Sequence, residues 1–233
     1  MDNNFLLIDK PKDWTSHDVV AKIRNIARKE TGNKKIKVGH AGTLDPFATG
    51  LLIIGIGREA TKKLDEFKAL PKTYVATLKL GATSDTQDST GAITKTQKHT
   101  TSGLNTKTPT ENELIDILQN FIGKQKQIPP MYSAKKVGGK KLYDLARKGI
   151  EIERQPSEIE IYDIKLLDYN YPDLKIEVDC STGTYIRTLA YDIGEKLEIG
   201  AYCDELRRTK IGQYDVRDAT DPQNTVLHDT RPT

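Results

Sequence analysis

Cysteine is scarce in this chain of 233 residues, and the motifs of common cofactor-binding folds are missing. The two cysteines, Cys180 and Cys203, form neither a disulfide framework nor a CxxC metal pair. No second histidine or cysteine stands at metal-ligand spacing, so no zinc site is predicted. GxxxxGKS/T, GxGxxG after a strand and GxSxG are absent, which leaves nucleotide hydrolysis, dinucleotide binding and serine hydrolysis without support. We expect neither metal nor cofactor.

Long apolar runs are missing as well. No stretch approaches the roughly 20 apolar residues that a membrane helix needs. The first five residues, Met1 to Phe5, contain no positively charged region and no long apolar segment, so no signal peptide is predicted. These features favour the cytoplasm and a protein that does not act at a membrane.

The overall charge is nearly balanced, at +3, and says little about partners. Its distribution says more, because the segment Lys124–Lys148 carries many basic residues and one acidic residue, Asp144. A local basic stripe of this kind can neutralise phosphates without the whole protein being basic. An ordinary solvated loop would have the same composition, and charge alone does not choose between the two.

Hydrophobic patterning predicts an α+β fold. Apolar or alternating runs predict strands over residues 5–8, 51–56, 73–80, 159–167 and 174–180. Apolar residues at helical spacing predict helices over residues 16–32, 110–123 and from about 185. Ser16 is the expected N-cap of the first helix, and Thr110 with Glu113 forms a capping box at the second. Strands and helices alternate without a βαβα rhythm, which favours one domain around a mixed sheet.

The expected domain covers residues 1–220. Within it, Gly81 to Thr110 is rich in small polar residues and is expected to form a long hairpin or loop. The basic segment at about 124–150 is interpreted as an insertion. Residues 221–233 are expected to form a polar, partly disordered tail.

The segment Gly39–Leu52 contains the strongest candidates for functional residues in the sequence. It surrounds one carboxylate, Asp45, and one imidazole, His40, with three glycines and a proline, and it leads into an apolar strand. Functional groups are often presented in this way, on irregular backbone anchored to a scaffold. An aspartate before proline is also a common turn starter, and propensity alone favours a plain turn at Asp45.

The same segment resembles the catalytic motif of the TruB family of tRNA pseudouridine-55 synthases, of bacterial type. Other segments resemble further motifs of that family in the same order: residues 7–11 with 14–16, 72–74, 81 with 85–88, 127–136, 143–149, 180–189 and 206–212. The matches span about residues 5–219 and outweigh the turn-only interpretation of Asp45. The resemblance implies a pseudouridine-synthase catalytic domain, with a mainly antiparallel mixed sheet flanked by helices and an RNA-gripping insertion.

By this resemblance the enzyme isomerises uridine 55 of the TψC loop without a cofactor, after flipping the base from its stack. Asp45 corresponds to the essential carboxylate. Attack on C1′ and removal of a sugar proton to give a glycal both remain open as its role. Arg187 corresponds to the arginine that pairs with this aspartate, and a guanidinium can orient a buried carboxylate and keep it ionised. Tyr74 corresponds to a tyrosine that stacks on the target base and is a candidate for proton transfer.

Five further residues are implied in substrate binding. His40 corresponds to the residue that fills the space vacated by the flipped uridine. Tyr185 and Leu206 correspond to residues that contact the substrate. Lys10 and Asp88 are further candidates for contact with RNA.

The expected partner is the TψC stem-loop of tRNA, bound by a monomer without a guide RNA. The residues after Thr220 are too few for the extra RNA-binding domain that many members carry, so we expect weaker binding to full tRNA than in those members, with little loss on an isolated stem-loop. A synthase acting on other RNA is one alternative. A tRNA-folding chaperone with little or no catalysis is another.

Overall fold

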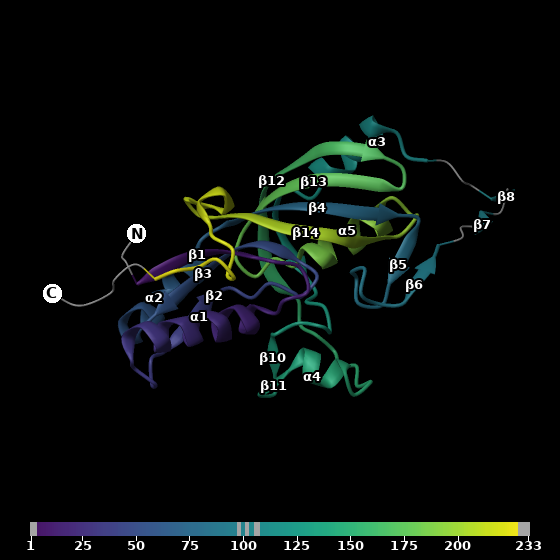
Figure 1. Ribbon diagram of the computed structural model, residues 1–233. Coiled ribbons are helices and arrows are strands. Elements are labelled where there is room, and N and C mark those ends of the chain that lie inside the picture. Colours follow the sequence, from purple (N-terminus) through teal and green to yellow (C-terminus); the bar gives the residue numbers. More distant parts are fainter. Residues whose placement is uncertain (1–3, 97–98, 101–102, 105–107, 228–233) are drawn as a thin grey trace. The chain divides into compact units, whose positions relative to one another are not determined.

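The computed structural model describes residues 4–96, 99–100, 103–104 and 108–227 (Figure 1). The chain forms two compact units. Unit 1 comprises residues 1–74 and 207–233, and unit 2 comprises residues 75–206. The boundaries fall within two strands, β4 (Lys72–Leu80) and β14 (Ala201–Ile211), so each of these strands contributes to both units.

Unit 1 is organised around β3 (Thr49–Ile56). β1 (Phe5–Lys10) and β2 (Val38–Ala41) pair with it antiparallel, and β14 pairs with it parallel through Arg207 and Arg208. The predicted strands at 5–8 and 51–56 are therefore confirmed. Since β3 is buried on both faces, its sequence is a continuous apolar run without polar alternation.

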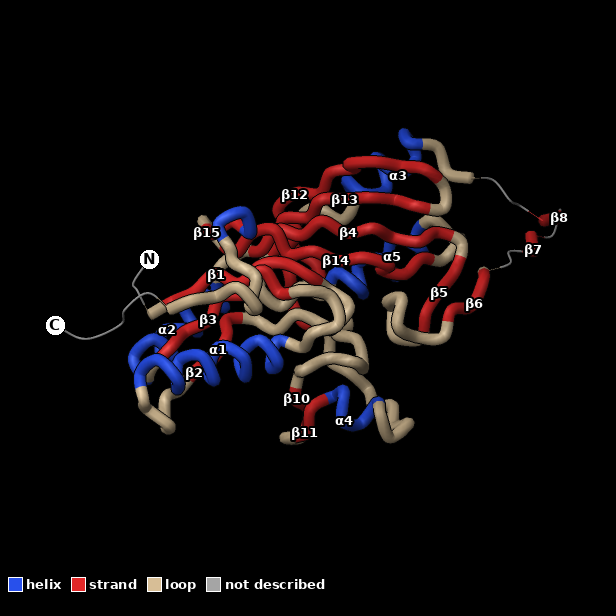
Figure 2. The backbone as a smooth tube through the Cα atoms, viewed as in Figure 1, coloured by secondary structure: helices blue, strands red, loops and turns tan. Residues whose placement is uncertain are grey.

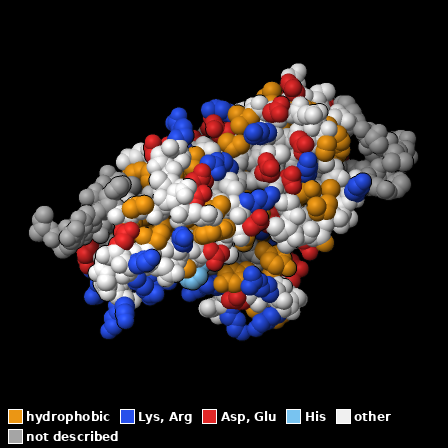
Figure 3. Space-filling model, in the orientation of Figure 1, with side chains coloured by type: hydrophobic (Ala, Val, Ile, Leu, Met, Phe, Trp, Pro, Cys, Tyr) orange, Lys and Arg blue, Asp and Glu red, His pale blue; other side chains and the backbone are white. Residues whose placement is uncertain are grey.

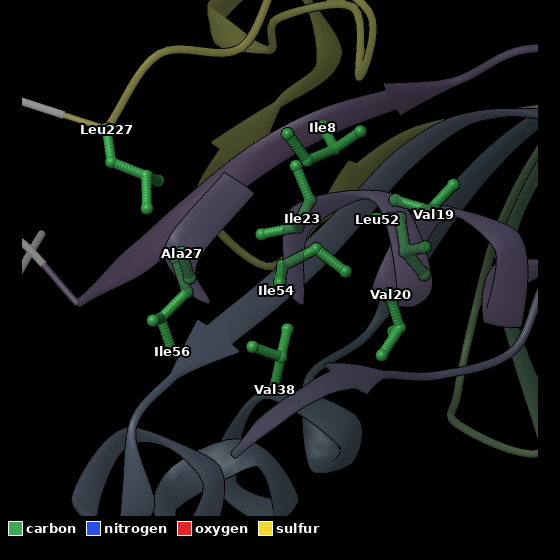
Figure 4. Packing of buried hydrophobic residues seen from close by; sticks show 10 residues of the cluster. All are labelled: Ile8, Val19, Val20, Ile23, Ala27, Val38, Leu52, Ile54, Ile56 and Leu227. Atoms are coloured by element: carbon green, nitrogen blue, oxygen red, sulfur yellow. The ribbon is translucent and has the colours of Figure 1, made fainter. Parts of the chain in front are cut away.

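Two helices cover the two faces of β3. Leu52 and Ile54 pack with the apolar stripe of α1 (Ser16–Thr31), as Figure 4 shows. Leu51 and Ile53, which point the other way along the strand, pack with α2 (Arg58–Ala69).

The first predicted helix is confirmed, but its predicted N-cap is wrong. Thr15, not Ser16, caps α1, in a reciprocal capping box with Asp18, and Gly32 ends the helix in the left-handed conformation. Both residues are capable caps by type. Ser16 lies one position inside the helix, where its hydroxyl serves another segment.

In unit 2 the strands follow the order β14, β4, β13 (Asp173–Cys180), β12 (Ser157–Asn170) and β9 (Gly123–Gln127), seen as red tubes in Figure 2. The antiparallel β12–β13 pair and the alternating burial of β4 and β13 confirm the predicted strands. Helix α3 (Glu111–Gln119) packs on β12, and α5 (Ile186–Lys196) begins just after Tyr185 as predicted. With the parallel β3–β14 pair, the sheet is mixed and mainly antiparallel, which confirms the α+β class.

The remaining elements are short. They are β5 (Ala82–Ser84) with β6 (Ile93–Lys95), β7 (His99–Thr100) with β8 (Gly103–Leu104), β10 (Lys136–Val137) with β11 (Lys140–Lys141), α4 (Leu142–Ala146), β15 (Tyr214–Asp215) and a 3-10 turn at Val216–Asp218. The β5–β6 and β7–β8 pairs agree with the hairpin predicted over 81–110, of which residues 97–98, 101–102 and 105–107 lie outside the described part.

Three details of the prediction change. Helix α3 ends at Gln119, so Phe121 and Ile122 lie beyond it, and Gly123 opens β9 at a φ of 104° rather than capping the helix. The segment predicted as an insertion thus begins within a sheet strand. The tail is packed as far as Leu227, which is buried against α1, and residues 228–233 lie outside the described part.

Gly50 offers a direct test of the β3–β14 pairing. It has a φ of 106°, and a Cβ there would lie 2.3 Å from the Arg208 carbonyl oxygen. We expect Gly50→Ala to destabilise the protein by at least about 2 kcal/mol, because strain and a backbone clash combine. Gly32→Ala, with a φ of 69° and open space around it, should cost only about 1 kcal/mol. Chemical denaturation gives the free energy of unfolding of both variants. An equal decrease in the two would contradict the close pairing of β3 and β14 at Gly50.

Candidate active site

Asp45 lies in unit 1, on the loop of residues 42–48 between β2 and β3, here called the aspartate loop. Its side chain is half-buried, whereas Leu44 and Phe47 on either side are buried in the core. The amide of Ala48 donates to the carbonyl of Asp45 at 3.2 Å, which closes a turn. The loop therefore holds the carboxylate in place through its apolar neighbours.

Ser16 ties the aspartate loop to α1. The amide of Leu44 donates to its Oγ at 2.8 Å, and Oγ donates to the Leu44 carbonyl at 3.1 Å. Ser16 is almost fully buried. Because both polar groups of Leu44 are satisfied by one hydroxyl, the residue before Asp45 has a fixed orientation.

Lys10 ties the same loop to β1. Its side chain is fully buried, and its Nζ donates to the carbonyls of Pro11, Trp14 and Pro46 at 2.8, 2.6 and 3.3 Å. Burial lowers the pKa of Lys10 to about 8, and the negative charge of Asp45 opposes that shift. This geometry favours a positioning role for Lys10, and its direct contact with RNA stays a prediction.

Arg208 ties the loop to β14. It is also fully buried, with Nε donating to the Leu51 carbonyl at 2.8 Å and Nη2 donating to the Gly42 carbonyl at 3.0 Å. Its neighbour Arg207 makes a bidentate ion pair with Asp9 at 2.6 and 3.0 Å. Three elements, β1, α1 and β14, thus hold one short loop.

His40 is half-buried on β2, five positions before Asp45. Its Nδ1 is buried and makes no hydrogen bond within the described part of the chain. Burial, and then the nearby Arg208 charge, lower the pKa of His40 to about 4, so the imidazole is neutral near pH 7. Tyr74 is the last residue of unit 1 on β4 and is largely buried.

The other predicted site residues belong to unit 2. Arg187, buried on the first turn of α5, donates to the carbonyls of Thr86 and Tyr132 at 3.0 and 2.6 Å. Its Nη1 lies 3.3 Å from the Asp88 carboxylate. Asp88 is itself buried, and its Oδ1 accepts from the Thr90 amide at 3.0 Å. Unit 2 therefore brings together two predicted site residues as a buried ion pair, and contact of Asp88 with RNA stays a prediction.

Tyr185 is tied to the basic segment by Gln127. The Gln127 amide donates to the Tyr185 carbonyl at 3.0 Å and accepts from the Tyr185 amide at 2.8 Å. Together with the bond from Arg187 to Tyr132, this joins the start of α5 to the segment at 124–150. The predicted contact residue Leu206 is largely buried on β14, at the end of unit 2.

Sequence reasoning did not single out Ser16, Arg208 or Gln127 for these roles. Each is a polar side chain that satisfies the backbone of a segment remote in sequence. No local pattern marks such residues, although Arg208 stands in the segment 206–212 that resembles a family motif.

Comparison with known proteins assigns the class and then the family. A family model described as the N-terminal domain of TruB family pseudouridylate synthases matches residues 28–186, and one described as the tRNA pseudouridylate synthase B C-terminal domain matches residues 187–229. The class is therefore that of the pseudouridylate synthases. The chain belongs to the TruB family.

Relatives and solved structures agree. Proteins named tRNA pseudouridine synthase B are 49% identical over 217 residues in Phocaeicola vulgatus, covering 91% of this chain and 87% of the relative, and 46% identical over 221 residues in Bacteroides fragilis, covering 93% and 90%. A structure titled as a Cbf5-Nop10-Gar1 complex is 28% identical with a TM-score of 0.65, and it matches 91% of this chain but only 49% of its own.

The described residues bear on two of the predicted absences. No helix there is long and apolar enough to cross a membrane. No group of three histidine, cysteine, aspartate or glutamate side chains there is arranged to hold a metal ion. Independence from metals and cofactors stays a prediction.

The negative charge of Asp45 should affect the pKa of Lys10 measurably. Asp45→Asn removes the attraction that favours the charged ammonium, so the pKa of Lys10 should fall further below about 8. Asp13→Asn, which removes a weaker attraction, should lower it less. Titration of the Lys10 ammonium by NMR measures both, and an unchanged or raised pKa in Asp45→Asn would contradict the geometry.

Proposed function

We propose that this protein isomerises uridine 55 in the TψC loop of tRNA to pseudouridine, as a tRNA pseudouridine(55) synthase. The observation that carries the proposal is the 46–49% identity, over most of both chains, to proteins named tRNA pseudouridine synthase B. The anchored aspartate loop supports it, since this is the segment on which the expected catalytic carboxylate lies.

The reaction exchanges one bond for another within the substrate. The N1–C1′ glycosidic bond breaks, the uracil turns over, and C5 bonds to C1′. The C5 proton goes to solvent, N1 gains a proton, and no other atom or electron is exchanged. Glycosidases commonly use two carboxylates, one of which protonates the leaving group. Uracil leaves as a delocalised anion and needs less help, so one carboxylate suffices.

Asp45 is proposed as that carboxylate. Attack on C1′ and removal of a sugar proton both require its ionised form. We assign Arg187 the role of keeping Asp45 ionised, because the family resemblance implies it and a guanidinium held by Asp88 and two carbonyls is rigid. Tyr74 is assigned to stacking on the target base.

Three further residues are proposed to bind the substrate around the flipped nucleotide, and a fourth is proposed to position the aspartate loop. His40 fills the vacated space, and its neutral imidazole can enter a base stack without desolvating a charge. Tyr185 and Leu206 contact the uridine. Lys10 acts by positioning the aspartate loop.

The proposed partner is tRNA, bound by a monomer in the cytoplasm. The structure titled as a Cbf5-Nop10-Gar1 complex, and another titled as an H/ACA RNP bound to a substrate RNA, are assemblies. This chain spans about half of the chain it matches in each of them. We propose that it acts without a guide RNA, because the basic segment at 124–150 resembles the RNA-gripping insertion of the tRNA-type enzymes.

Tritium release tests the proposal most directly. With a TψC stem-loop tritiated at C5 of the target uridine, and with no metal or cofactor added, the protein should release tritium. Asp45→Asn should abolish release while RNA binding persists, since only the reacting carboxylate is lost. Asp13→Asn is the matched control, because Asp13 is an exposed carboxylate whose amide donates to Pro46 in the same loop.

Two outcomes would overturn the assignment. Release that persists in Asp45→Asn would remove Asp45 from the chemistry. RNA binding by the unaltered protein without any release, on both the stem-loop and full tRNA, would favour the tRNA-folding chaperone instead.

Arg187 can be tested by a substitution that keeps its charge. Lysine cannot reach Asp88 and two carbonyls at once, so Arg187→Lys should lower the single-turnover rate by roughly 100-fold or more. Arg154→Lys is the control, since Arg154 also donates to a carbonyl, that of Pro129, in the same unit. Thermal unfolding of both variants checks the fold. A folded Arg187→Lys protein with full activity would refute the assignment.

A further inference from the structure

Unit 1 carries an open hollow of about 630 Å³, and His40 is the one of its lining residues that has a role in the proposed function. Its walls come from α1, the connector after it, β2 and α2. Its polar lining is basic and includes Arg24, Arg28, Lys35, Lys37, Lys68 and His40. None of the lining residues is acidic.

The cations of the hollow differ in whether their side chains already have a partner. Arg24 donates to the carbonyl of Val38 at 3.3 Å, and Lys68 pairs with Asp65 at 2.7 Å. Arg28, Lys35 and Lys37 are exposed and form no ion pair within the described part of the chain. Figure 3 shows several lysine and arginine side chains at the lower left of the view, where α1 and the connector after it lie in Figure 1. Unpaired cations around one concavity attract an anion more strongly than the same charges spread over a convex surface.

The hollow also has an apolar part, which an ordinary solvated basic face lacks. Ile36, Val38 and Leu64 line it, and His40 adds an imidazole that burial keeps neutral. A cationic rim with an apolar wall suits a ligand that is anionic at one end and apolar beside it, as a nucleotide unit is. Binding in such a site would combine phosphate neutralisation with contact to a sugar or base face.

The position of the hollow relates it to the aspartate loop. His40 lies on β2, the strand that leads directly into that loop, and both are in unit 1. A ligand in the hollow would therefore lie beside the residue assigned to the space vacated by the target uridine.

We propose that this hollow binds the RNA backbone next to the target nucleotide, taking its phosphates on Arg28, Lys35 and Lys37. The inference rests on the proposed function for its ligand. It adds an electrostatic contact on unit 1, separate from the basic segment at 124–150 of unit 2. Because the contact is next to the target, it belongs to the TψC stem-loop rather than to the body of the tRNA.

A pair of double variants tests the inference. Arg28→Ala with Lys35→Ala removes two cations of the hollow, and Lys29→Ala with Lys34→Ala removes two adjacent cations that do not line it. Both change the net charge equally. We expect the hollow variant to bind an unmodified TψC stem-loop roughly tenfold more weakly at low salt. Because two phosphate contacts are removed, the slope of log K against log salt should become shallower by about 1.5 to 2. The control should stay within about twofold.

Three results would overturn the inference. If both double variants lowered the affinity for the stem-loop equally, the hollow would bind RNA no differently from an ordinary basic surface. Weakening on full tRNA without weakening on the stem-loop would place the contact elsewhere on the tRNA. Binding of inorganic phosphate that is lost in the hollow variant, with RNA affinity unchanged, would make it a site for free anions.

The chemistry is tested separately in the same proteins. At saturating stem-loop the control variant, Lys29→Ala with Lys34→Ala, should release tritium at the unaltered rate, since Asp45 and its tethers are intact and neither lysine lines the hollow. A protein that binds the stem-loop but releases no tritium would refute the proposed function. The comparison of RNA affinities would still decide the inference about the hollow.

Discussion

Buried cations that donate to backbone carbonyls are the constraint on which this structure depends. Lys10 and Arg208 are fully buried, and both donate hydrogen bonds to carbonyls of the aspartate loop. A buried charge is costly unless its hydrogen bonds are made. The loop can therefore shift only by leaving these donors unsatisfied, and this restrains the irregular backbone that carries Asp45.

Unit 2 uses the same device around Arg187. Its guanidinium satisfies carbonyls from two separate segments, at Thr86 and Tyr132, while Asp88 balances its charge. Gln127 adds a reciprocal pair of bonds to Tyr185. The segment predicted to grip RNA is thus hydrogen-bonded to Tyr185 and Arg187, which are predicted to lie near the substrate. A change in the conformation of this segment on RNA binding would therefore also move these two residues.

The electrostatics separate into two kinds. The buried cations Lys10 and Arg208 donate to backbone carbonyls and so organise the backbone. Burial lowers the pKa values of Lys10 and His40. The exposed cations of α1 and its connector are unpaired within the described residues and face solvent. A net charge of only +3 is compatible with RNA binding because the available positive charge is local.

The sequence by itself determined the strands with strong period-two or continuous apolar patterns, the end of α1 at Gly32, the capping box that starts α3, and the family, because these depend on neighbours in the chain. It did not indicate α2 or β14, whose residues mix charged and apolar types. It also chose Ser16 as a cap, since Thr15 and Ser16 are equally suited by type. Only the tertiary structure decided that Ser16 and Arg208 hold the loop of Asp45 and that Asp88 pairs with Arg187. These partners lie 28 to 166 residues apart, and local pattern carries no information on which distant group a buried polar side chain will meet.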